Sequence, residues 1–210
     1  LQGLQNHRLF ILDNMLLHDK LKPYRLILAS QSPRRRQLLA DAGLEFTLAE
    51  RFECEESFSE DMPAEQVAEY LSALKSEAYP QPLAEQDILL TADTVVIACG
   101  RILGKPADRA DAINMITMLS GREHKVITGV TLRTSERVKS FSVVSKVYFR
   151  ELAADEIEYY VDTYRPYDKA GSYGIQEWIG YVGIEGIEGS FFNVMGLPVQ
   201  RLYCELSDFI

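Results

Sequence analysis

Three consecutive arginines, Arg34 to Arg36, follow Ser32 and Pro33 at the end of a short apolar run. The segment 25–29 predicts a buried strand, Ser32 an N-cap, Pro33 the first helical residue and Gly43 the end of the helix. Arginines are unfavourable in the first turn of a helix, because the positive end of the dipole and its unpaired amides repel cations. The same terminus attracts anions, and guanidinium groups donate paired hydrogen bonds to phosphate oxygens. The arrangement therefore predicts a phosphate-binding site.

Carboxylates that could activate water or hold a metal ion occur in two further segments. Asp93 lies inside the apolar segment "TADTVV", where an unpaired carboxylate would be costly to bury. Pairing with a backbone amide at a strand end would explain it about as well as a catalytic role. The run "ECEES" supplies Glu53, Glu55 and Glu56, and such a run by itself is usually a solvated loop. With Asp93 elsewhere in the chain, it becomes a candidate metal-binding segment.

Two lysines and one glutamine complete the candidate binding residues. The segment "GRILGKP" resembles a Walker phosphate loop, but its glycines are one residue too close and Pro106 replaces the magnesium-binding Ser or Thr. We reject a Walker site, although Lys105 could still reach a phosphate; an exposed lysine is the common alternative. Lys75, near the end of its helix, also has an explanation without a ligand, because cations are favourable at that end of the helix dipole. Gln176, in "YDKAGSYGIQEW", carries a donor and an acceptor that suit a nucleobase edge, although most glutamines face water.

Several separated motifs, in one order, resemble the Maf family of nucleoside triphosphate pyrophosphatases: "LASQSPRR", "EES", "ADTVV", "GKP", "SGREHKVITGV", "DKAGSYGIQ" and "GSFFNVMGLPV". The resemblance covers nearly everything from Arg25 to the C-terminus. The segment "DKAGSYGIQ" is similar to the branch that acts on dTTP and UTP rather than the branch that acts on 7-methyl-GTP. The resemblance implies hydrolysis between the α- and β-phosphates, giving a nucleoside monophosphate and pyrophosphate, with Mg²⁺ or Mn²⁺ as cofactor.

The same resemblance assigns roles to single residues. Asp93 matches the proton acceptor that activates water, and Glu56 with Asp93 matches the metal site. Glu56 is preferred to Glu55 because Ser57 reproduces the family's Glu-Ser pair. The expected cradle for the triphosphate consists of Ser32, Arg34, Arg35, Lys75 and Lys105. The positions that set base preference match Arg34, Thr94 and Gln176.

Other functions stay open at the level of sequence. One is a pyrophosphatase for 7-methyl-GTP, and another is a nucleotide-sensing regulator of cell division with little turnover. A structural, septum-associated interaction protein would not need an intact set of acids, bases and cations. Retention of Asp93 favours hydrolysis. The resemblance also implies a homodimer.

Composition restricts the partners further. The chain has 210 residues, 47% of them hydrophobic, which is enough for a globular core. A formal net charge of −9 argues against nonspecific binding to nucleic acid, but a small phosphorylated ligand needs only a few cations focused in a cleft. Cys54, Cys99 and Cys204 are isolated and odd in number, so we expect a reducing compartment, the cytoplasm. No apolar stretch approaches a membrane span.

Segments typical of strands and helices alternate along the chain. Expected strands are 25–29, 45–52, 87–100, 124–134 and 137–149. Expected helices are 33–42, 63–79, 107–121, 154–164 and 196–209, the last with Pro198 just inside its start. This order predicts an α/β fold with a mixed sheet, and the family resemblance implies a strongly twisted sheet with flanking helices that form two lobes around a cleft, as in ITPase-like proteins. We expect one catalytic domain over 25–210, with a second lobe at about 120–180, and an N-terminal extension of unclear status over 1–24.

Overall fold

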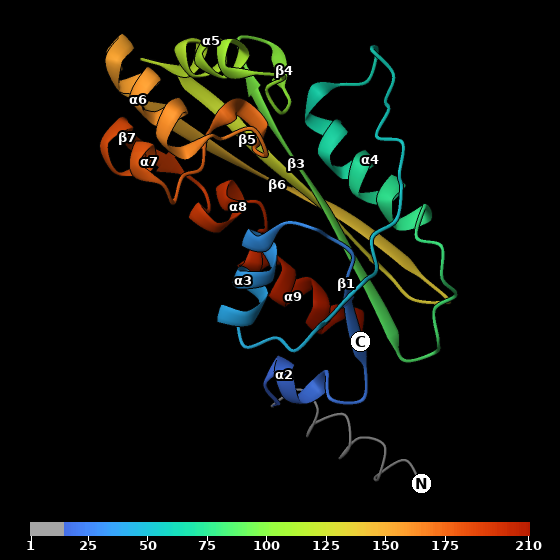
Figure 1. Ribbon diagram of the computed structural model, residues 1–210. Coiled ribbons are helices and arrows are strands. Elements are labelled where there is room, and N and C mark those ends of the chain that lie inside the picture. The colour runs from blue at the N-terminus through green and yellow to red at the C-terminus, as the bar shows by residue number, and fades with distance from the viewer. Residues whose placement is uncertain (1–14) are drawn as a thin grey trace, which may run out of the picture.

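A seven-stranded mixed sheet forms the centre of the molecule, and helices pack on it and around its ends (Figure 1). The computed structural model describes residues 15–210, so most of the expected extension 1–24 lies outside the described residues. The strand order is β2-β1-β3-β5-β6-β7, with β4 beside β3; β1 pairs in parallel with β2 and β3, and all other pairs are antiparallel. The strands are β1 (Arg25–Leu28), β2 (Thr47–Leu48), β3 (Asp87–Ala98), β4 (Arg101–Leu103), β5 (Glu123–Arg133), β6 (Val138–Phe149) and β7 (Ile184–Glu188). The predicted α/β fold with a mixed sheet is confirmed.

The longer helices lie where the sequence predicts them. The described helices are α2 (Leu17–Lys20), α3 (Pro33–Asp41), α4 (Ala64–Glu77), α5 (Arg109–Leu119), α6 (Ala154–Tyr164), α7 (Trp178–Gly183), α8 (Phe191–Met195) and α9 (Val199–Phe209), with a 3₁₀ turn, η1, at Ala170–Ser172. None of these helices is long and apolar enough to cross a membrane, within the part of the chain that the structure describes.

Two local predictions need correction, and four short elements have no prediction in the sequence. The strand expected over 45–52 is reduced to the two residues of β2, whose side chains are exposed and so have no core to pack against. Pro198 occupies the N-cap position before α9 instead of its first turn. The short elements α2, α7, α8 and β7 were not predicted, because four to six residues are too few to establish a hydrophobic period.

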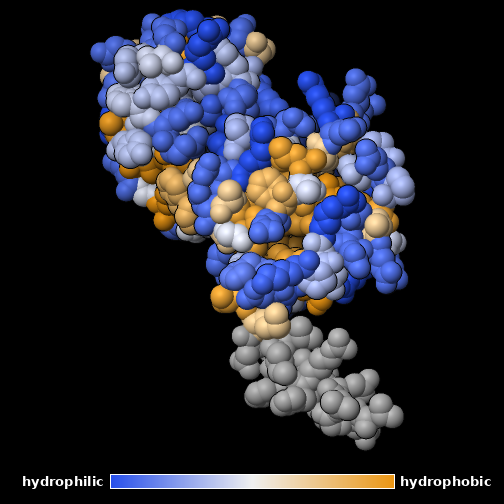
Figure 2. Space-filling view, turned by 60° about the horizontal axis from the view of Figure 1, so that its bottom comes forward, coloured by the Kyte–Doolittle hydropathy of each residue, from blue (hydrophilic) through white to orange (hydrophobic). Residues whose placement is uncertain are grey.

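The two largest hydrophobic clusters of the described residues pack against different parts of the sheet, and we call the regions around them the two lobes. The first cluster lies around α3 and α9 and includes Leu28, Leu39, Leu90, Val130, Leu202 and Leu206. The second lies around α5 and α6 and includes Ile116, Leu119, Val126, Val147, Tyr160 and Ile179. Met195 at the end of α8 packs against both. On the face seen in Figure 2, hydrophilic residues cover most of the surface, and hydrophobic residues show across its middle and along its left edge.

An unpaired stretch of β3 lies between the lobes. One edge of β3 pairs with β5 from Leu89 to Ile97. On the other edge, β1 pairs with β3 only as far as Leu90, and β4 pairs with it only from Val96 onward. Within the described residues, 91–95 therefore have no strand beside them on that edge, and Ala92, Asp93, Thr94 and Val95 line one cleft there.

Candidate active site

A cleft of about 1170 Å³ opens along the unpaired edge of β3. Its walls come from the segment before α3, the acidic loop that precedes α4, the end of the β4 hairpin and the loop around η1. The cleft brings together every residue singled out in the sequence: Ser32, Arg34, Arg35, Glu56, Lys75, Asp93, Thr94, Lys105 and Gln176. Since β3 alternates its side chains, Asp93 and Thr94 point to opposite faces of the sheet, and both reach the cleft only because this edge is open.

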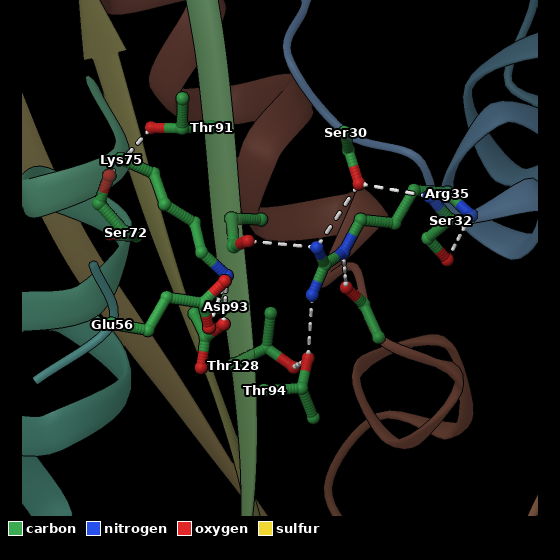
Figure 3. Close-up of polar contacts among 12 residues, drawn as sticks. Ser30, Ser32, Arg35, Glu56, Ser72, Lys75, Thr91, Asp93, Thr94 and Thr128 are labelled. Carbon is green, nitrogen blue, oxygen red and sulfur yellow. Dashed lines mark hydrogen bonds and ion pairs between the residues drawn. The ribbon is translucent and has the colours of Figure 1, made fainter. Parts of the chain in front are cut away.

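Asp93 and Glu56 converge on the ammonium group of Lys75 (Figure 3). Lys75 Nζ donates to Asp93 Oδ1 and lies 3.0 Å from Glu56 Oε2. The side chains of Lys75 and Asp93 are largely buried, whereas Glu56 is half exposed. Asp93 Oδ2 makes no hydrogen bond within residues 15–210, and it remains available to a ligand or to water.

A glycine on the neighbouring strand brings Lys75 this close. Gly129 of β5 lies directly opposite Asp93 in the sheet. A β-carbon at Gly129 would overlap the backbone of Ala68 in α4, so α4 packs against the sheet at a distance that only glycine permits. Lys75 lies two turns further along α4 and therefore reaches Asp93 on the same face of the sheet.

The start of α3 has the predicted local structure. Ser32 Oγ accepts a hydrogen bond from Arg35 N and caps the helix, and Pro33 is its first residue. Gly43, just beyond the last turn, has a φ of 70°, which favours glycine and stops the helix.

The guanidinium group of Arg35 is almost fully occupied by the protein itself. Its Nε donates to Gly196 O at 2.8 Å, and Nη1 donates to Ser30 Oγ at 3.2 Å and Ala92 O at 2.8 Å. Nη2 donates to Thr94 Oγ1 at 3.1 Å. Burial lowers the pKa of Arg35 from its ordinary value. One of its five N–H bonds remains for a ligand, and the others fasten α3 to β3 and to the end of α8.

Arg34 contacts the opposite wall of the cleft. Its Nη1 donates to Asp168 Oδ2 at 2.9 Å, and Lys169 Nζ donates to the other oxygen of Asp168 at 2.8 Å. Burial opposes ionisation of Asp168, but the two cations hold its pKa below the ordinary value. Lys169 also lies 3.1 Å from Glu177 Oε1 and is only 8% exposed.

Sequence reasoning missed several residues at this wall. Asp168, Lys169 and Glu177 lie in or next to the segment "DKAGSYGIQ", from which only Gln176 was selected. The available signal was an acid and a base next to each other in a glycine-rich binding loop. Ser30 was also missed; its hydroxyl accepts from Arg35 and from Ser32 N.

Three other predicted residues line the cleft, and they differ in how many hydrogen bonds they make to the protein. Gln176 Oε1 is buried and has no hydrogen-bond partner within residues 15–210. Thr94 Oγ1 lies 2.9 Å from Thr128 Oγ1, besides accepting from Arg35. Lys105 is exposed, and in the part of the chain that the structure describes it forms no ion pair.

A cleft with paired carboxylates, several cations and an unpaired amide oxygen suits an enzyme that handles a phosphorylated ligand. Residues 25–209 match the family model described as "Maf-like protein". The chain belongs to the Maf family, which confirms the family predicted from its motifs.

Curated relatives cover almost the whole of this chain. A dTTP/UTP pyrophosphatase of Porphyromonas gingivalis (strain ATCC BAA-308 / W83) is 51% identical over 193 residues, which cover 91% of this chain and 97% of the relative. A dTTP/UTP pyrophosphatase of Parabacteroides distasonis is 48% identical over 191 residues, which cover 91% and 99%. Among solved structures, a HAM1 protein from Coxiella burnetii aligns with a TM-score of 0.43 and 16% identity, covering 88% of this chain and 99% of that one.

Proposed function

We propose that the protein hydrolyses dTTP and UTP between the α- and β-phosphates and releases the nucleoside monophosphate and pyrophosphate. The observation that carries this proposal is the convergence of Asp93, Lys75 and Glu56 at the open edge of β3. The choice of dTTP and UTP is supported by relatives that are 48% and 51% identical in sequence and bear the name dTTP/UTP pyrophosphatase.

Each of these residues has its own role in the reaction. Asp93 accepts the proton of a water molecule whose oxygen forms a bond to the α-phosphorus, while the bond to the bridging oxygen breaks and pyrophosphate leaves. The contact from Lys75 to Oδ1 keeps the other oxygen of Asp93 directed to that proton. Arg34 and Lys105, together with Lys75, offset the charge of the triphosphate, which is the main demand of phosphoryl chemistry.

Glu56 and Asp93 are the residues that would hold Mg²⁺ or Mn²⁺. They fit this role because two carboxylates already surround one cation, the ammonium of Lys75. Within residues 15–210, no group of three or more His, Cys, Asp or Glu side chains forms a metal site by itself. Magnesium sites built from one or two carboxylates plus substrate phosphates are common, and the bound ion would neutralise phosphate charge. Removal of divalent ions with a chelator should abolish turnover, and added Mg²⁺ or Mn²⁺ should restore it.

Pyrophosphate release from a panel of triphosphates tests the proposal. The purified protein is incubated with dTTP, UTP, dATP, GTP and 7-methyl-GTP at one metal concentration. We expect dTTP and UTP to be hydrolysed fastest. Faster hydrolysis of 7-methyl-GTP than of dTTP would assign the protein to the other branch, and binding without release would indicate a nucleotide sensor.

The variant Asp93→Asn belongs in the same assay. It preserves the shape of the side chain but removes the proton acceptor and one negative charge, so turnover should fall at least about a hundredfold, as is typical for loss of a general base. Circular dichroism checks that the fold is retained. Unchanged turnover would remove Asp93 from the mechanism.

We also propose that the protein works in the cytoplasm, which is supported by three cysteines that form no disulfide. The homodimer implied by the family resemblance stays a prediction, and light scattering of the purified protein would test it.

A further inference from the structure

A buried hydrogen-bonded network of polar groups, formed by Tyr160, Glu177, Lys169 and the Gly174 amide, lies beneath the loop that carries Gln176. Tyr160 of α6 is fully buried; its hydroxyl donates to Glu177 Oε2 and accepts from Gly174 N at 3.0 Å. The other oxygen of Glu177 lies 3.1 Å from Lys169 Nζ. Burial and the Glu177 carboxylate strongly raise the pKa of Tyr160, so its hydroxyl keeps its proton and remains a donor.

This network comes close to Gln176 in the cleft at Gly174. A β-carbon on Gly174 would lie 2.9 Å from Gln176 Nε2, 2.9 Å from Glu177 Cδ and 3.0 Å from Lys169 Cε. The three side chains therefore meet over the α-carbon of Gly174, and each limits the room of the others. Two of them are fixed by partners, since Glu177 is held by Tyr160 and Lys169 by Asp168 and Glu177.

Among the described residues, Gln176 has no such partner of its own. Its Oε1 is buried and makes no hydrogen bond within the described residues, so no protein group fixes the orientation of the amide. Its Nε2 shares the space over Gly174 with the side chains of Glu177 and Lys169. The position of an amide that must match a base edge therefore depends on groups that never touch the base.

We propose that Tyr160 is a positioning residue for base selection, acting through Glu177 and the Gly174 amide on Gln176. This inference rests on the proposed function, because it assumes that Gln176 contacts the base. Loss of the Tyr160 hydroxyl leaves the Glu177 carboxylate with Lys169 as its one remaining partner among the described residues and leaves the Gly174 N–H without its acceptor, and the loop can then relax around Gln176. Asp93 and Lys75 lie on β3 and α4 and are not members of this network, so we expect the chemical step to be retained.

The variant Tyr160→Phe tests this against a matched control. Tyr164 lies one turn further along α6, its ring stacks on that of Tyr160 with centroids 5.1 Å apart, and its hydroxyl makes no hydrogen bond within residues 15–210. Tyr160→Phe should lower the ratio of kcat/KM for dTTP over dATP about tenfold, through a higher KM for dTTP, with kcat changed by less than about twofold. Tyr164→Phe should leave the ratio within about twofold of wild type. Equal ratios in the two variants would overturn the inference.

A double-mutant cycle separates positioning from general loosening of the fold. Gln176→Ala removes the group through which Tyr160 is proposed to act. In that background, Tyr160→Phe should change the dTTP to dATP ratio by less than about twofold, because no amide remains to be displaced. The same tenfold loss in both backgrounds would mean that Tyr160 acts on the whole lobe, and the inference would be wrong.

A second variant keeps the test decisive if Tyr160→Phe does not fold. Glu177→Ala leaves the Tyr160 to Gly174 hydrogen bond but removes the carboxylate that packs beside Gln176, so the same loss of ratio is expected. An unchanged ratio in Glu177→Ala would contradict the inference. If the wild type hydrolyses dTTP and UTP selectively and no variant alters selectivity, only the inference fails. If the wild type releases pyrophosphate from no triphosphate, the proposed function fails and the inference fails with it.

Discussion

Arg34 and Arg35 are neighbours in the chain, but their guanidinium groups have different surroundings. Arg35 is enclosed and makes four hydrogen bonds to the protein, two of them to the backbone carbonyls of Ala92 and Gly196. Arg34 makes one ion pair with Asp168, which is mostly exposed. An exposed ion pair stabilises a fold little, and its cation is free to exchange partners when a phosphate arrives. At this scale, we predict that Arg35 maintains the site and that Arg34 binds the substrate.

Alanine variants of the two arginines should separate these roles. Arg35→Ala leaves two buried carbonyls without their donor and should lower the free energy of unfolding by about 3 kcal/mol. Arg34→Ala should change it by less than about 1 kcal/mol but raise KM for dTTP about tenfold, because a charge-assisted bond to phosphate is lost. Urea denaturation and steady-state kinetics measure both quantities.

Arg36→Ala serves as the control, since Arg36 makes one exposed hydrogen bond to Gln31 O. It should resemble wild type in stability and in kinetics. If Arg34→Ala proves as destabilising as Arg35→Ala, the division of roles between the two arginines is wrong.

The elements around β3 determine which side chains meet. The open edge of β3 admits Asp93 and Thr94 to one cleft although they point to opposite faces of the sheet. The contact between α4 and β5 at Gly129 places Lys75 opposite Asp93. The register of three elements, α4, β3 and β5, is therefore a condition for the acid and its cation to pair.

Gly129→Ala should disturb that register. The added methyl group overlaps the backbone of α4, so the helix has to move outward, and Lys75 moves away from Asp93 with it. We expect the free energy of unfolding to fall by about 2 kcal/mol, a typical cost of overpacking, and kcat to fall about tenfold or more.

Gly186→Ala on β7 is the matched control for a glycine in a strand. Among the described residues, a β-carbon there meets only Tyr148 Cδ2, at 3.8 Å, an ordinary contact. Its kcat should equal that of wild type. Wild-type kcat in Gly129→Ala would show that the approach of α4 is not required for catalysis.

At the scale of the whole molecule, each lobe has its own core, and the second core contains a buried histidine. His124 of β5 is 2% exposed, its Nε2 lies 2.7 Å from Tyr173 Oη, and its ring packs edge-on against Phe149 and Tyr173. Burial lowers the pKa of His124 to about 4. Tyr173 lines the cleft, so the neutral imidazole supports a wall of the site from inside the lobe.

This histidine makes stability depend on pH in a defined range. In the unfolded chain His124 binds a proton near its ordinary pKa of about 6.5, whereas in the folded protein it does so only near 4. The stability that the protein gains by keeping His124 neutral is therefore fully present above pH 6.5, and it is lost as the pH falls from 6.5 towards 4. Between pH 7 and pH 5 this should lower the free energy of unfolding by about 2 kcal/mol.

Urea denaturation of the wild type and of His124→Gln at both pH values isolates the effect. The carboxylates titrate in both proteins, so the difference between the two pH dependences belongs to His124. Equal pH dependence in the two proteins would mean that the imidazole is not held neutral.

Much of the fold follows from local patterns in the sequence. Ser32, Pro33 and Gly43 define both ends of α3, and the helical period predicts α4. The long alternating segments around residues 134–137 predict the β5–β6 hairpin. These signals act between residues close in the chain, where caps, turns and side-chain periods have fixed spacing, and motif spacing likewise indicated the chemical types of residue in the site.

Only the tertiary structure decided which of those residues contact one another. Nothing near Gly129 in the sequence indicates that α4 packs over it, and nothing near Arg35 shows that four protein oxygens occupy its guanidinium. The Tyr160 to Glu177 contact likewise joins a helix to a distant loop. Such contacts depend on sheet register, on which edge stays open and on how closely helices approach. Those are properties of the assembled sheet and helices, because residues far apart in the chain meet only when whole elements pack together.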